Sequence, residues 1–154
     1  SALKKIKKHN FTCLCLGHES ADFSIGNIKI KFLGRIVSEK KIAKIYNSAD
    51  VVVIPSRMEN LTQIGTESIS CGVPVVAFDV GGNSDIVDNQ RTGILVQPFE
   101  IEKFAESIIE ILGWPKSKYQ KISNFCRNKA LDNWSFSKIS IKYFNFFKKV
   151  LNEN

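Results

Sequence analysis

Short apolar runs alternate along the chain with stretches of helical periodicity, and this alternation is the feature that most constrains the fold. Five runs have the length and composition of buried strands, at residues 12–17, 28–34, 51–55, 74–78 and 92–96. The remaining periodic stretches predict helices over 38–50, 62–72, 83–88, 101–112, 116–131 and about 136–151. Strands separated by helices favour parallel pairing. We therefore expect an α/β fold, a Rossmann-like parallel sheet with helices on both faces.

Length and composition indicate one ordinary globular domain. The chain has 154 residues, 44% of them hydrophobic and 24% charged. No apolar run approaches the roughly 18 residues of a membrane span. The first residues, SALKKIKKH, read as the tail of an amphipathic helix without an initiator Met, which predicts a fragment of a longer protein. Four cysteines without zinc-ligand spacing indicate a reduced, cytoplasmic protein.

The net charge of +7 is unevenly spread. Residues 1–49 carry ten Lys or Arg against three acids, residues 50–110 three against ten, and residues 111–154 nine against two. A solvated surface explains such blocks. The functional alternative is attraction to anionic phosphates or to the inner face of an anionic membrane. No nucleic-acid motif accompanies the charge, so nucleic acid is not an expected partner.

Two carboxylates flank a predicted helix start in the segment PSRMENLTQIGTESIS. Glu59 precedes the helix of residues 62–72 and Glu67 lies inside it. In parallel sheets, ligands bind outside the carboxyl ends of the strands, where this loop is expected. The first amides of a helix favour a phosphate, while carboxylates accept hydrogen bonds from sugar hydroxyls. The pair therefore suits a nucleotide sugar, although two glutamates alone are more often a loop residue and a helix-surface residue.

The residues around this pair carry a longer pattern. The stretch ADVVVIPSRMENLTQIGTESISCGVPVVAFDVGGNSDIV (49–87) resembles the donor-binding core of the retaining glycosyltransferases of family 4, the glycosyl transferases group 1. The resemblance rests on two glutamates eight residues apart, the segment CGVPVV (71–76), and the pair Gly81-Gly82 followed by Asp85-Ile86-Val87. It extends more loosely over nearly the whole chain. It implies that the chain is the C-terminal half of a GT-B fold, with the N-terminal acceptor domain absent.

The resemblance also implies residue roles. Glu59 contacts the transferred sugar and is the catalytic residue, and Glu67 contacts the ribose. Donor-binding residues are further expected in the loop after Glu59 and at the ends of the first two strands: Asn60, Leu61, Thr62, Gly17, Arg35 and Ile36. The implied chemistry needs no cofactor and no metal ion, and no D-x-D motif is present. The nucleotide sugar is the expected partner.

The chain departs from the family pattern at several positions. Asn60-Leu61-Thr62 replaces the usual x-Phe-Gly after the first glutamate, and Ser68 and Ser70 stand where Ala is common. These changes leave the donor sugar and its base open. The family's first strand of this domain, and the Arg and Lys that hold the diphosphate, have no match in the chain. The fragment alone is therefore expected to be inactive.

One other function stays open at this point, because a Rossmann-like module could hold a nucleotide or a partner protein without catalysis. A nucleotide-sugar epimerase of similar architecture is disfavoured, because such enzymes lack the pattern of Glu59 and Glu67. The helix of residues 136–151 carries apolar side chains on more than one face. We expect part of this surface to be exposed, for docking on the missing half or for self-association. A peripheral membrane contact through its lysines is the weaker alternative.

Overall fold

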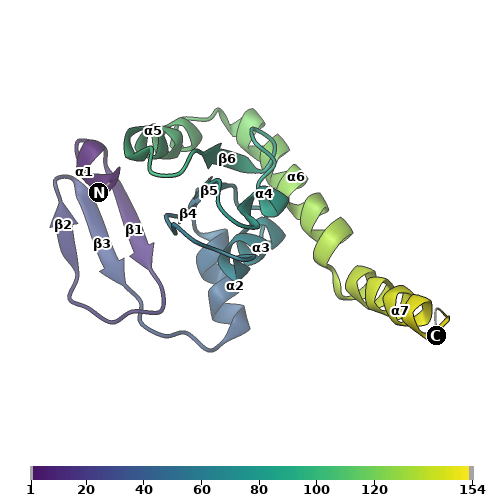
Figure 1. Ribbon diagram of the computed structural model, residues 1–154. Helices are drawn as coiled ribbons and strands as arrows, with labels where there is room; N and C mark the ends of the chain where they lie inside the picture. Colours follow the sequence, from purple (N-terminus) through teal and green to yellow (C-terminus); the bar gives the residue numbers. More distant parts are fainter. Residues whose placement is uncertain (1, 153–154) are drawn as a thin grey trace.

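The computed structural model describes residues 2–152 and has the expected alternation of strands and helices (Figure 1). The strands are β1 (Phe11–Cys15), β2 (Phe23–Ile25), β3 (Ile28–Phe32), β4 (Val52–Ile54), β5 (Val75–Phe78) and β6 (Gly93–Val96). The helices are α1 (Ala2–Lys5), α2 (Glu39–Asn47), α3 (Gln63–Ser70), α4 (Asn83–Ile86), α5 (Ile101–Leu112), α6 (Lys116–Trp134) and α7 (Phe136–Asn152). Every expected strand and helix is present. The expectation of an α/β fold with parallel strands is confirmed.

The sheet of β4, β5 and β6 is parallel and is covered by helices on both faces. Strand β5 lies in the middle and all four of its residues are buried. Val76 and Phe78 belong to the apolar cluster that contains α5, whereas Val75 and Ala77 belong to the cluster that contains residues of α3 and α6. Successive side chains of a strand point to opposite faces, so each face receives its own helical layer.

A second sheet contains β1, β3 and β2 in that order, and the sequence did not predict its third strand. Strand β3 pairs in parallel with β1 and antiparallel with β2. Gly26 and Asn27 make the tight connection between β2 and β3, and Gly26 has a positive φ of 61°. Within residues 2–152, no strand pairing joins β1 to β4. The parallel strands therefore form two sheets rather than the single continuous sheet that we expected.

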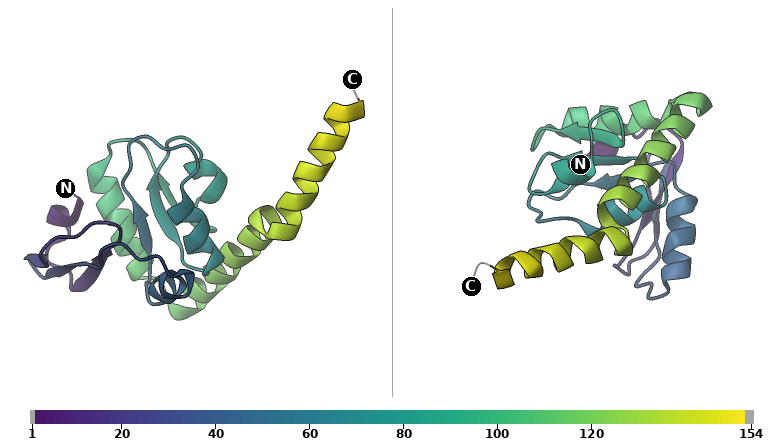
Figure 2. Two further views of the ribbon diagram at one scale, coloured as in Figure 1. Left: turned by 90° about the horizontal axis from the view of Figure 1, so that it is seen from below. Right: turned by 90° about the vertical axis from the view of Figure 1, so that its right-hand side faces the viewer.

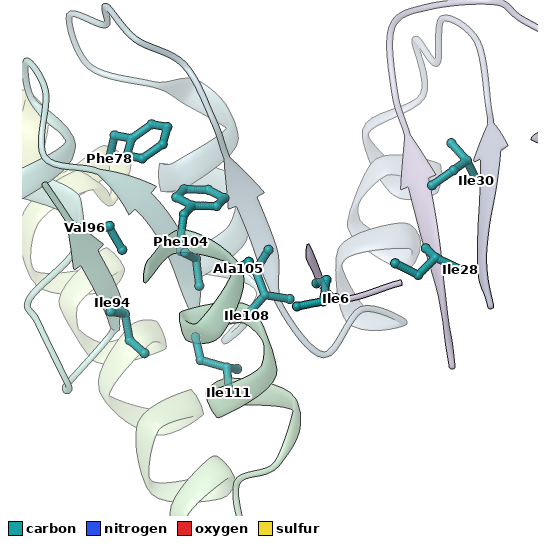
Figure 3. Packing of buried hydrophobic residues seen from close by; sticks show 11 residues of the cluster. Ile6, Ile28, Ile30, Phe78, Ile94, Val96, Phe104, Ala105, Ile108 and Ile111 are labelled. Carbon is teal, nitrogen blue, oxygen red and sulfur yellow. The ribbon is translucent and has the colours of Figure 1, made fainter. Parts of the chain in front are cut away.

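A shared apolar core holds the two sheets together. Figure 3 shows Ile6, just after α1, between Ile108 of α5 and Ile28 of β3. Ile6 is 6% exposed and Ile28 is fully buried. Burying an isoleucine side chain contributes roughly 1.5–3 kcal/mol, so these contacts stabilise the packing of the β1–β3–β2 sheet against the β4–β5–β6 sheet.

The C-terminal helix leaves this body. Helix α6 contributes Ile122, Cys126 and Ala130 to the core, but the backbone is extended at Ser135 and α7 then projects outward (Figure 2). No residue of α7 is buried. Its exposed apolar side chains include Phe136, Ile141, Tyr143, Phe144, Phe146, Phe147 and Leu151. The expectation of an exposed aromatic face is confirmed, while its partner stays a prediction. None of the helices described here has the length and hydropathy of a membrane span.

Candidate functional site

The loop between β4 and α3 carries the expected catalytic residue and three of the expected donor-binding residues. After β4 ends at Ile54, the chain reaches Glu59, which is half-buried, and then the exposed residues Asn60 and Leu61. Thr62 is 6% exposed and occupies the N-cap position of α3. The first amides of a helix have no partner within the helix, so this end of α3 offers N–H donors beside the two exposed loop residues.

The turn that contains Gly81 and Gly82 packs directly against the backbone of this loop. The N–H of Gly82 donates to the carbonyl oxygen of Asn60 at 2.5 Å. At Gly81, where φ is 52°, a Cβ would lie only 1.7 Å from the carbonyl oxygen of Glu59. Only glycine permits such an approach of two backbone segments. The backbone of Glu59 is therefore seated directly on the turn that follows β5.

The end of that turn is itself braced. Asn83, the first residue of α4, is fully buried, and its side-chain N–H donates to the carbonyl oxygen of Phe78 at 3.0 Å. This bond ties the start of α4 to the last residue of β5. Because buried polar groups are costly to leave unpaired, the bond favours one conformation of the connection. The loop that carries Glu59 thus packs on a turn whose first and last residues are joined by this hydrogen bond.

Glu67 lies in the second turn of α3 and is exposed. Its Oε2 accepts a hydrogen bond of 2.8 Å from the hydroxyl of Tyr46 in α2. Tyr46 is 4% exposed, and burial, followed by its contact with Glu67, raises its pKa well above the ordinary value. The phenol therefore remains a proton donor to the carboxylate at neutral pH.

The other expected donor-binding residues gather at the ends of β1 and β3. Gly17 follows β1 and donates its N–H to the carbonyl oxygen of Gly34 at 2.9 Å. The residues after Gly34 are Arg35, which is exposed, and Ile36, which is half-buried. The structure thus brings Gly17 beside the segment that leads to Arg35 and Ile36.

The expected residues therefore form two groups on two sheets, and a cleft shared by them stays a prediction. Two hollows of the described surface have other linings. One, of about 420 Å³, is lined by Asn47, Ser70, Cys71, Gly72, Ser123, Asn124 and Arg127. The other, of about 150 Å³, is lined by Ala2, Pro55, Arg57, Phe78, Phe99, Ile101 and Phe104. Neither hollow is lined by the residues expected to bind the donor.

The contacts that support this site were not predicted from the sequence. Tyr46 lies in the predicted helix of residues 38–50, and the local signal was that a buried tyrosine needs a polar partner for its hydroxyl. The local signal at Gly81 and Gly82 was that paired glycines permit a close backbone approach. The partners themselves, Glu67 and the backbone of Glu59, follow only from the packing of segments that are distant in sequence.

The donors and acceptors of the first group define what it can bind. The start of α3 offers backbone N–H groups, which favour a phosphate. Two carboxylates, Glu59 and Glu67, can only accept hydrogen bonds when ionised, so they favour neutral hydroxyl groups. Among residues 2–152, no three His, Cys, Asp or Glu side chains are placed to hold a metal ion. The loop between β4 and α3, together with α3, thus offers N–H groups that can donate hydrogen bonds to a phosphate and carboxylates that can accept them from hydroxyl groups. This combination fits a phosphorylated sugar.

Comparison with known proteins yields a family match over most of the chain. The family model described as glycosyl transferases group 1 matches residues 1–113. The D-inositol 3-phosphate glycosyltransferase of Mycobacteroides abscessus is 33% identical over 101 residues, which are 62% of this chain and 23% of that protein. The match with this relative therefore spans about a quarter of its length.

Solved structures show the same fold. A glycosyltransferase from Rickettsia africae superposes with a TM-score of 0.82 at 25% identity, covering 99% of this chain and 43% of that one. The Anabaena protein HepE, solved in complex with UDP-glucose, superposes with a TM-score of 0.70 at 24% identity. That superposition covers 79% of this chain and 32% of HepE.

Proposed function

The chain belongs to the glycosyl transferases group 1 family, and we propose that it is the donor-binding half of a retaining glycosyltransferase. Such an enzyme moves a sugar from a nucleotide sugar to a glycan or a lipid-linked acceptor. The observation that carries the proposal is the seating of the Glu59 backbone on Gly81, at the N-terminal end of α3. This arrangement fixes the backbone of a glutamate beside a set of backbone N–H donors.

Each group of the site receives a role in this proposal. Glu59 contacts the transferred sugar, the amides of residues 60–62 contact the sugar or the diphosphate, and Glu67 accepts hydrogen bonds from the ribose. Arg35 and Ile36 border the base, and Gly17 lines the same cleft. The binding of UDP-glucose by HepE, a protein of the same fold, supports a nucleotide sugar as the ligand class.

The open edges of β1 and β4 support the proposal that the chain is part of a two-domain protein. A doubly wound sheet has the strand order 3-2-1-4-5-6. The observed orders, β1-β3-β2 with β2 as an added antiparallel strand and β4-β5-β6, fit this arrangement if one parallel strand lies between β1 and β4. We propose that residues outside the chain supply this strand, together with the acceptor-binding half and the cations that hold the diphosphate.

The surface of α7 fits the same proposal. Its aromatic residues are exposed, with Phe144 at 68% and Phe147 at 57%. The superposition on the Rickettsia protein covers 99% of this chain but only 43% of the Rickettsia protein. We propose that the acceptor-binding half of the same polypeptide covers the aromatic face of α7. The four free cysteines support action in a reducing compartment such as the cytoplasm.

In the complete protein, Glu67→Ala should weaken the binding of the nucleotide sugar. The carboxylate is a charged acceptor, and loss of its hydrogen bonds to the ribose costs on the order of 1.5–3 kcal/mol. We therefore expect Kd to rise about 10- to 150-fold. Isothermal titration calorimetry with UDP-, GDP- and ADP-sugars would first identify the donor and then measure the change in Kd.

The matched control is Glu110→Ala, which removes an exposed carboxylate from α5. Its Kd should stay within about twofold of the wild-type value. Equal affinities of the Glu67→Ala variant and the wild type would contradict the ribose role. If none of the nucleotide sugars binds the wild-type protein, the proposed function fails, and a module that binds a partner without a sugar donor becomes the better account.

A further inference from the structure

The hydroxyl of the buried residue Tyr46 has a specific hydrogen-bond partner. Tyr46 lies in the last turns of α2 and is 4% exposed. Its hydroxyl donates to Oε2 of Glu67 at 2.8 Å, across the contact of α2 with α3. The two residues are 21 positions apart in the sequence. The bond therefore links two helices through one side chain of the donor site.

Packing alone does not account for this hydroxyl. A phenylalanine at position 46 would fill the same space and would leave no polar atom to be satisfied. A buried tyrosine needs a hydrogen-bond partner, and Tyr46 finds one in a carboxylate that is otherwise exposed on the surface of α3. The free-energy cost of burying the hydroxyl is therefore offset only when Glu67 lies within hydrogen-bond distance of it.

The bond restricts what the carboxylate of Glu67 can do. A glutamate on a helix surface samples several rotamers, and fixing such a side chain on binding costs part of the binding free energy. The hydroxyl of Tyr46 occupies Oε2, which selects the rotamers that keep this oxygen toward α2. The other oxygen, Oε1, retains its lone pairs for a hydroxyl group of the ligand. The side chain is therefore oriented before the ligand arrives.

We propose that Tyr46 is a positioning residue for donor binding, which holds Glu67 in the conformation that accepts hydrogen bonds from the ribose. This inference rests on the proposed function, because it assigns to Tyr46 the support of a residue that the function places at the ribose. Tyr46 does not contact the donor. It raises affinity by removing rotameric freedom from Glu67 in the free protein.

The Tyr46→Phe variant of the complete protein tests this role. It keeps the ring and removes only the hydroxyl. We expect Kd for the nucleotide sugar to rise about 3- to 10-fold, as the loss of one immobilised side chain predicts. The value of kcat at saturating donor should stay within about twofold, because the transferred sugar and Glu59 are untouched. The matched control is Tyr119→Phe, at a half-buried tyrosine of α6 that lies beside Asp50.

A double variant separates positioning from structural support. In the Glu67→Ala background, the hydroxyl of Tyr46 has lost its partner, so Tyr46→Phe should leave Kd unchanged. A purely structural role would instead weaken binding equally in both backgrounds. That result, or an unchanged Kd for Tyr46→Phe alone while Glu67→Ala weakens binding, would overturn the inference. If Glu67→Ala also leaves Kd unchanged, the ribose site itself is wrong, which is a failure of the proposed function.

Discussion

In the complete protein, Glu59→Gln should lower kcat/KM for sugar transfer by about 10²- to 10³-fold. Glutamine has nearly the same shape and still accepts a hydrogen bond, so the change removes mainly the negative charge. Cleavage of a glycosidic bond passes through a state with positive charge on the sugar, as in the oxocarbenium-like transition states of glycoside hydrolysis. A carboxylate that touches the transferred sugar stabilises this charge most in the transition state, so its loss should lower kcat.

Steady-state kinetics with the identified donor would measure this effect. Glu106→Gln, which neutralises an exposed carboxylate of α5, serves as the control and should stay within about twofold of the wild type. The melting temperature of the Glu59→Gln variant should be close to that of the wild type, because Glu59 is only half-buried. A Glu59→Gln enzyme with wild-type kcat/KM would remove Glu59 from the catalytic step.

The Gly81→Ala variant should lose both activity and stability. The new Cβ would lie 1.7 Å from the carbonyl oxygen of Glu59, far inside van der Waals contact. The left-handed backbone conformation at this position also costs alanine about 1 kcal/mol or more in free energy relative to glycine. The loop that carries Glu59 must therefore move. A displacement of about 1 Å at a catalytic group can cost roughly 100-fold, and we expect at least that loss in kcat/KM.

Gly113→Ala is the matched control for this glycine. Gly113 has an ordinary φ of −90°, and a Cβ there would meet the carbonyl oxygen of Ile109 at 3.3 Å. We expect a change of less than about 1 kcal/mol in its free energy of unfolding and no change in kcat/KM. Thermal unfolding and kinetics measured at one temperature, where both variants remain folded, separate the two effects. Wild-type activity in Gly81→Ala would show that the loop does not depend on this contact.

Periodicity was enough to predict most of the secondary structure. Buried runs such as those of β4 and β5 are continuous, while α5 repeats its apolar residues at helical spacing, and both signals are local. Strand β2 was missed because it has only three residues and lies at a sheet edge. Its Gly26-Asn27 connection resembles a two-residue hairpin turn and was the one local signal for it.

The division of the strands into two sheets could not be predicted in the same way. Strand order depends on which strands pair with each other, and the local sequence of β1 or β4 does not identify the strand with which it pairs. The sequence placed Glu59 in the loop before a helix and Glu67 within that helix, as the structure has them. It could not place the Tyr46 hydroxyl against Glu67, or Gly81 beneath Glu59, because these contacts follow from tertiary packing.

A crystal structure of the complete protein with its nucleotide sugar would test the central claim most directly. We predict that the diphosphate lies within hydrogen-bond distance of the amides of residues 60–62, and that a ribose hydroxyl donates to Oε1 of Glu67. The transferred sugar should contact Glu59. A donor bound elsewhere, for example in the hollow that contains Asn124 and Arg127, would contradict the assignment of this edge as the donor site.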